Sequence, residues 1–115
     1  MSSLAIRIIP EPLRSLAFGS ISGTYMGIGT ALIAPSRIFM VQNLTDQQMT
    51  FSLDGTNDHF TLPSEGFILL DLTANKTVVQ GAFIAEGTRV YVKETGSSPT
   101  LGAVYVTTFY GIDAI

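Results

Sequence analysis

Residues 37–72 read RIFMVQNLTDQQMTFSLDGTNDHFTLPSEGFILLDL and consist of short apolar runs separated by turn residues. The run 37–43 is continuously apolar, as expected of a central strand that is buried on both faces. In 49–53, Met, Phe and Leu alternate with Thr and Ser, which is the pattern of a half-buried strand. Asp-Gly at 54–55 and Pro-Ser-Glu-Gly at 63–66 are typical of turns between strands. The stretch predicts an all-β fold.

The rest of the chain follows the same pattern of short strands. We expect two strands, or one long bent strand, in 15–34, where glycines interrupt a β-rich sequence. Further strands are expected at 81–85, 88–94 and 103–110, and the polar stretch 73–81 is expected to be a loop. Because no stretch keeps a helical period, we predict about eight strands in a single β-sandwich, jelly-roll or immunoglobulin-like, or in a small barrel.

The N-terminus differs from this pattern. Apolar residues alternate over the first eight positions, and Pro10 and Pro12 then end the strand and stiffen the chain. We therefore expect 1–14 to be an extended N-terminal arm and 15–115 to be the β-sandwich domain. Two roles for the arm stay open: the first strand of the domain's own sheet, which we favour, or a strand added to the sheet of a neighbouring copy.

The composition excludes several functional classes. The 115 residues fit one domain; 46% are apolar, only 13% are charged, and the formal net charge is −3. No basic run is present that could follow a nucleic-acid backbone. The chain has no cysteine, which excludes zinc ribbons and Cys nucleophiles, and with His59 as its single histidine it offers almost nothing for multi-His metal sites or Ser-His-Asp chemistry. We expect neither an enzyme nor a cofactor.

The low charge has two possible explanations: a membrane protein, or a subunit that buries its surface against other chains. The uncharged stretch between Arg14 and Arg37 is long enough to cross a bilayer, but its glycines and Pro35 would interrupt a helix. The first residues also lack the compact apolar region of a secretion signal. We therefore expect no membrane partner and no secretion.

The densest polar cluster is DGTNDH at 54–59. Its carboxylate and amide oxygens could hold a cation, although the same residue types cap turns with their own side chains, and we favour capping. His59 could act as a base oriented by Asp58, but adjacent strand residues point to opposite faces. Glu65 and Glu86 lie in Glu-Gly turns and are expected to face solvent.

Five short segments of the sequence resemble a known family: VQNLTD at 41–46, DGTND at 54–58, LPSEG at 62–66, EGTRVYVK at 86–93 and the ending 102–110. They are similar to the small β-sandwich virion proteins of tailed bacteriophages, of the neck, collar or decoration type. These segments are strands and turns without a catalytic motif. The resemblance therefore implies a non-enzymatic structural subunit that is present in many symmetric copies.

The resemblance implies a ring in the neck or collar, at the head-to-tail junction, made in the host cytoplasm and incorporated into the virion. Its partners would be further copies of itself and a portal, adaptor or major capsid protein. The alternatives are a capsid decoration (cement) protein and, from another class, a carbohydrate-binding module that uses aromatic strands. The interface is expected to involve apolar residues of the arm and aromatic residues of the last strands: Leu4, Ile6, Ile8, Pro10, Pro12, Tyr91, Tyr105, Phe109 and Tyr110.

Overall fold

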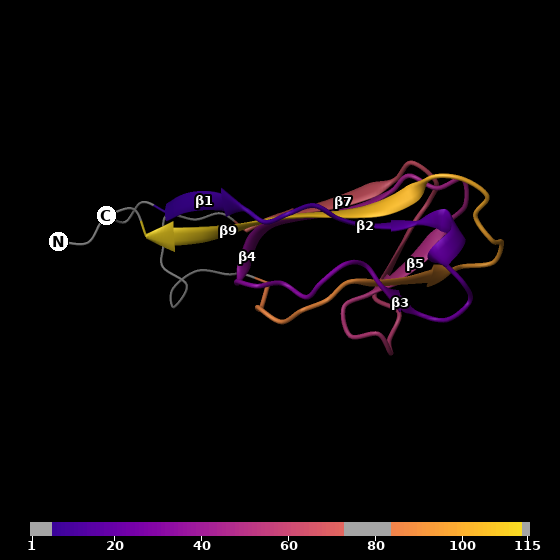
Figure 1. Ribbon diagram of the computed structural model, residues 1–115, viewed down its shortest axis with the longest axis horizontal. Helices are drawn as coiled ribbons and strands as arrows, with labels where there is room; N and C mark the ends of the chain where they lie inside the picture. The colour runs from indigo at the N-terminus through magenta and orange to yellow at the C-terminus, as the bar shows by residue number, and fades with distance from the viewer. Residues whose placement is uncertain (1–5, 73–83, 114–115) are drawn as a thin grey trace.

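The structure, a computed structural model, describes residues 6–72 and 84–113 and is almost entirely β in this part of the chain (Figure 1). Its elements, in chain order, are β1 (Ile6–Pro10), β2 (Arg14–Ala17), the short 3-10 helix η1 (Phe18–Ser20), β3 (Met26–Gly27), β4 (Ser36–Asn43), β5 (Met49–Ser52), β6 (Phe60–Leu62), β7 (Phe67–Asp71), β8 (Tyr91–Glu94) and β9 (Ala103–Asp113). The predicted all-β class is confirmed.

The strands form two antiparallel sheets. Sheet A has the order β1-β9-β4-β7, with β2 also paired to β9, and sheet B has the order β3-β8-β5-β6. Every strand pair in both sheets is antiparallel. Figure 1 shows the sheets as two layers, with β7 and β9 in one and β3 and β5 in the other. This arrangement is compatible with the predicted β-sandwich.

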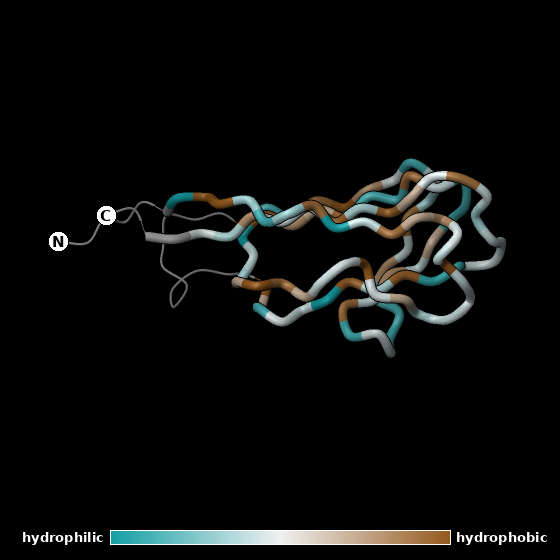
Figure 2. The backbone as a smooth tube through the Cα atoms, viewed as in Figure 1, coloured by the Kyte–Doolittle hydropathy of each residue, from teal (hydrophilic) through white to brown (hydrophobic). Residues whose placement is uncertain are grey.

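The core lies between the two layers, because the inward side chains of both sheets are apolar. Hydrophobic residues occur along the strands of both layers (Figure 2). Phe51 of β5 stacks on Phe60 of β6 with ring centroids 5.2 Å apart. The fully buried core residues are Ile28, Phe39, Val41, Met49, Phe51, Val92, Val104 and Val106. Alternation along a strand therefore places every second residue of β4 and β9 in the core and the others on the outer face.

The long strand β9 organises sheet A. Its second half pairs with β1, its first half pairs with β2 on the same edge, and its other edge pairs with β4. The N-terminal segment from Ile6 onwards is therefore a strand of the chain's own sheet, one of the two roles that the sequence left open. In Figure 1, β1 and the end of β9 form a ribbon that extends beyond the two-layer body.

Of two expectations about individual strands, the burial of 37–43 on both faces is wrong, and the presence of two strands in 15–34 is confirmed. The strand at 37–43 is central, as predicted, but it is not buried on both faces: Phe39 and Val41 are buried, whereas Ile38 and Met40 are half-buried. No described element covers the outer face of sheet A. In 15–34, β2 and the two-residue β3 are the strands, and the remainder is irregular, yet it buries Ile28 against the core.

The second half of the chain follows the expected strand order. β8 and β9 occupy most of the segments predicted to be strands, and Val90 and Val92 face the core. The predicted loop at 73–81 lies outside the described residues. Of the strand expected at 81–85, Ile84 forms an isolated antiparallel bridge to Ser36.

Candidate interaction surface

The polar loop at 54–59 is a capped turn. Oδ1 of Asp54 accepts hydrogen bonds from the backbone N–H groups of Thr56 and Asn57 and from the Ser52 hydroxyl, each at 2.8 Å. Its Oδ2 accepts one from Nδ2 of Asn57, also at 2.8 Å. The backbone N–H groups of Asn57 and Thr56 hold the pKa of the Asp54 carboxyl well below its usual range. These oxygens cap the loop, as the residue types favoured.

Asp58 and His59 point to different partners. Asp58 accepts a hydrogen bond from the Tyr25 hydroxyl and pairs with Nζ of Lys93 at 3.1 Å. Nδ1 of His59 accepts the backbone N–H of Leu53 at 2.8 Å instead. Burial, followed by the hydrogen bond to Asp58, raises the pKa of Tyr25 to about 12. Among residues 6–72 and 84–113, no group of three or more His, Cys, Asp or Glu side chains could hold a metal ion.

The aspartates of these turns predict a loss of stability in acid. Hydrogen bonds from Thr100, Asn57 and Tyr25 lower the pKa values of Asp46, Asp54 and Asp58, respectively. The stability that they contribute is complete above the unfolded pKa of about 3.9 and is lost as the pH falls through the folded values. The melting temperature should therefore drop below about pH 4. The drop in melting temperature should be smaller in Asp54→Asn than in wild type. The control Glu86→Gln removes an exposed carboxylate, and its drop in melting temperature should equal that of wild type. Equal drops in both variants would contradict the assignment.

The two sheets have chemically different outer faces. In sheet B the outward residues are mainly polar, with Thr50 and Ser52 buried and Thr61 exposed: Thr50, Ser52, Thr61, Tyr91 and Lys93. In sheet A the outward residues are mainly apolar: Ile38, Met40, Phe67, Leu69, Tyr105 and Phe109. We call this second set the apolar face. It is the candidate interaction surface.

The apolar face is open to solvent at its β7 side. Phe67 is 60% exposed and Leu69 is 51% exposed. Among the outward residues of β4, β7 and the 103–110 part of β9, Asp71 is the only charged side chain. Large apolar side chains gathered on one exposed face of a small domain indicate a surface that is covered by another molecule.

The structure brings together part of the predicted interface. Tyr105 and Phe109 lie on the apolar face, and Pro10 is in register with Phe109 at its edge. Ile8, which is 38% exposed, continues the same side of the β1–β9 ribbon. Ile6 takes part in β1 through its backbone.

Other predicted interface residues lie elsewhere. Tyr91 belongs to sheet B, and Tyr110 alternates with Phe109 and so points to the opposite side of sheet A. Leu4 lies outside the described residues. The aromatic residues therefore do not form one stacking platform.

Phe67, Leu69 and Met40 were missed by reasoning from the sequence. Continuous apolar runs such as FILL are typical of strands buried on both faces, and nothing in the run indicates that no layer covers one face. The exposed side of β7 is a tertiary property that only the sheet order reveals.

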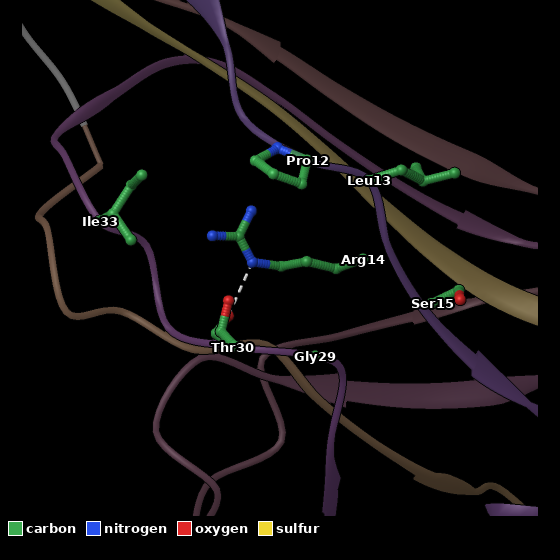
Figure 3. Close-up of a pocket in the computed structure, with 7 residues that line it drawn as sticks. All are labelled: Pro12, Leu13, Arg14, Ser15, Gly29, Thr30 and Ile33. Atoms are coloured by element: carbon green, nitrogen blue, oxygen red, sulfur yellow. Dashed lines mark hydrogen bonds between the residues drawn. The ribbon is translucent and has the colours of Figure 1, made fainter.

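Residues 11–13 connect β1 to β2, and we call them the β1–β2 hinge. A groove lies beside β2, between this hinge and the segment that follows β3 (Figure 3). It has a volume of about 490 Å³. Its lining includes the predicted residue Pro12 together with Leu13 and Ile33, which are 61% and 67% exposed. The groove is therefore largely apolar at its rim.

The floor of this groove is held by Arg14, a buried residue whose role was not apparent in the sequence. Its Nη2 pairs with Oε1 of Glu11 at 2.6 Å, and its Nη1 donates to the Thr108 hydroxyl at 3.0 Å. Its Nε donates to the Thr30 carbonyl at 2.7 Å, the bond drawn in Figure 3. Because the guanidinium is engaged by the protein itself, it fixes the hinge and the groove wall in place. The i, i+3 spacing of Glu11 and Arg14 was the only sequence signal for this pair.

A close approach at Gly29 completes the groove wall. Gly29 has φ +62°, and a Cβ there would lie 2.8 Å from the Arg14 Cβ and Cγ atoms. A side chain at this position would therefore collide with Arg14, in a backbone conformation that favours glycine.

No family model, no curated protein and no solved structure matches this chain. Within the described ranges, the structure contains no helix that is long and apolar enough to span a membrane.

Proposed function

We propose that the chain is a non-enzymatic structural subunit of a tailed-phage virion, arranged as a symmetric ring in the neck or collar at the head-to-tail junction. The observation that supports this function is the apolar face of sheet A. A soluble monomer would carry polar residues there, as sheet B does. A subunit of a larger particle covers such a face with its neighbours.

The particle itself is proposed from the strand-and-turn segments that resemble phage virion proteins. The polar cluster that offered an enzymatic alternative supports the structural role, since Asp54 and Asp58 are engaged in turn and ion-pair contacts. The proposed partners are copies of this chain and a portal or adaptor protein, and the proposed location is the virion.

A carbohydrate-binding module is not favoured by the geometry. Tyr91 lies in sheet B and Tyr110 points to the opposite side of sheet A, so that of the four predicted aromatic residues only Tyr105 and Phe109 share a face. A capsid decoration protein would use the same apolar face against the shell, so particle assembly must separate it from a neck protein.

Particles assembled without the chain test the proposed location. For a neck subunit we expect filled heads and tails that fail to join, visible by electron microscopy as separate populations. Complete particles that are less resistant to heat would instead indicate a decoration protein. Complete particles with unchanged heat resistance would contradict both structural roles. Complementation with the wild-type chain provides the control.

A further inference from the structure

Sheet A ends at β7 in an open edge. In an antiparallel ladder, the backbone groups of successive residues point alternately toward the paired strand and away from it. The hydrogen bond from the Leu72 N–H to the Arg37 carbonyl (2.7 Å) fixes this alternation, so that the even-numbered residues of β7 face β4. Phe67 and Leu69 therefore direct their N–H and C=O groups to the edge. No hydrogen-bond partner for these groups lies in the described part of the chain.

The opposite edge of the same sheet is open at β2. The hydrogen bond from the Phe18 N–H to the Gly102 carbonyl (3.0 Å) continues the β2–β9 ladder. By the same alternation, Ser15 and Ala17 direct their backbone groups away from β9. Both residues are exposed. Unpaired edges of this kind are templates for adding a strand from another chain.

The strand directions make these two edges complementary. Every neighbouring pair along the path β2, β9, β4 and β7 is antiparallel, so β7 runs opposite to β2. The two edges also lie at the same height in the sheet. One row of paired residues crosses the sheet from the β7 edge to the β2 edge: Phe67, Gln42, Tyr105 and Ser15. A second copy placed beside the first in the same orientation therefore brings β7 alongside β2 with ordinary antiparallel geometry.

The side chains agree with this pairing. When Phe67 lies opposite Ser15 of the second copy, Leu69 lies opposite Leu13 of that copy. Leu69 is exposed on the outer side of β7, so it can cover Leu13, which is exposed beside β2. The same register sets Glu65 beside Ala17 and Asp71 beside Glu11, whose buried carboxylate is already paired with Arg14.

Pairing of β7 with β7 of a second copy is less favourable in the register centred on Ile68. In the register that joins Phe67 to Leu69 of the other copy, Glu65 falls directly opposite Asp71, and like charges in that position are destabilising. This two-fold arrangement would also leave the β2 edge and its groove uncovered.

We propose that copies of this chain associate head to tail, with β7 of one copy added to the β2 edge of sheet A in the next. The proposal rests on the proposed ring and specifies its interface. The pairing joins the sheets of successive copies into one continuous sheet, and it joins their apolar faces into one surface. Because the two contacting patches differ, such an interface repeats from copy to copy and closes into a ring when the rotation permits.

Two variants block the two edges separately. Leu69→Lys places a charge at the exposed β7 edge, the usual protection of natural edge strands. Ala17→Pro removes an outward N–H that makes no hydrogen bond within the described chain, and Ala17 already has φ −71°, which suits proline. Thr61→Lys is the matched control, because it places the same charge at an exposed position of sheet B, away from both edges and from the apolar face of sheet A.

The masses of the full-length proteins, measured by light scattering behind a sizing column, test the proposal. We expect wild type and Thr61→Lys to be multimers and each edge variant alone to be a monomer. An equal mixture of the edge variants should form dimers and nothing larger, because one intact β7 edge can meet one intact β2 edge. Circular dichroism checks that each variant is folded, and Phe67→Lys replaces Leu69→Lys if that variant is not.

Three results would overturn the proposal: a wild-type monomer at every concentration tested, multimers of Ala17→Pro alone, or a mixture that stays monomeric. The proposed function fails independently of this interface. If the mixing experiment succeeds but purified particles lack the chain, the interface stands and the virion role falls. If both edge variants enter particles as efficiently as wild type, the virion role stands and the interface falls.

Discussion

Replacing Asn43 with alanine is expected to destabilise the fold by about 3–4 kcal/mol. Asn43 is fully buried at the end of β4. Its Nδ2 donates to the carbonyls of Gln47, Leu62 and Pro63, and its Oδ1 accepts the backbone N–H and the hydroxyl of Thr45. The Asn43 side chain, at the end of a strand of sheet A, thus links the β4–β5 turn to the end of β6 in sheet B. Alanine would leave several buried polar groups without partners.

Urea unfolding measures this loss, and Gln42→Ala is the matched control on the same strand. Gln42 is half-buried on the outer face of sheet A, so its replacement should change the free energy of unfolding by less than about 1 kcal/mol. If the two variants were equally stable, Asn43 would not be the link between the sheets that the hydrogen bonds indicate.

Replacing Arg14 with methionine is expected to destabilise the fold by about 3–5 kcal/mol, because it leaves the Glu11 carboxylate buried without its cation. Both members of the pair are buried, and Oε1 of Glu11 also accepts a hydrogen bond from Thr108. The loss should be accompanied by a weaker hinge between β1 and β2. The groove beside β2 should therefore lose its fixed wall.

The double variant Glu11→Leu/Arg14→Met separates a buried charge from lost packing. It should recover most of the stability lost in Arg14→Met, because an apolar pair in place of a buried ion pair is often neutral. Arg7→Met, a replacement of an exposed arginine in β1, should be nearly silent in the same unfolding experiment. An Arg14→Met variant as stable as wild type would show that the pair does not hold the hinge.

The strands of the second half of the chain could be predicted because their signals are local. Alternation in 103–110 placed Val104 and Val106 in the core and Tyr105 on the outer face, as the structure shows. The turns at Asp54-Gly55 and Glu65-Gly66 also lie where the turn residues predicted them. The strands and turns depend on residues that are close together in the sequence, so one sequence is enough to predict them.

The open surfaces could not be predicted, because they depend on which strands become edges. Phe67 and Leu69 occur in an apolar run that would suit a buried strand, and their exposure follows only from the position of β7 at the end of sheet A. The buried Arg14 likewise depends on Thr30 and Thr108, which are distant in the sequence. Pairings between distant segments carry no local signal that one sequence reveals.

The measurement that tests the proposed virion role most directly is a search for this chain in virions purified from cells that produce it, with its copy number obtained by quantitative mass spectrometry and labelled reference peptides. The account predicts several copies per particle in a fixed ratio to the portal protein, as a symmetric ring requires. Absence of the chain from complete, infectious particles would contradict it.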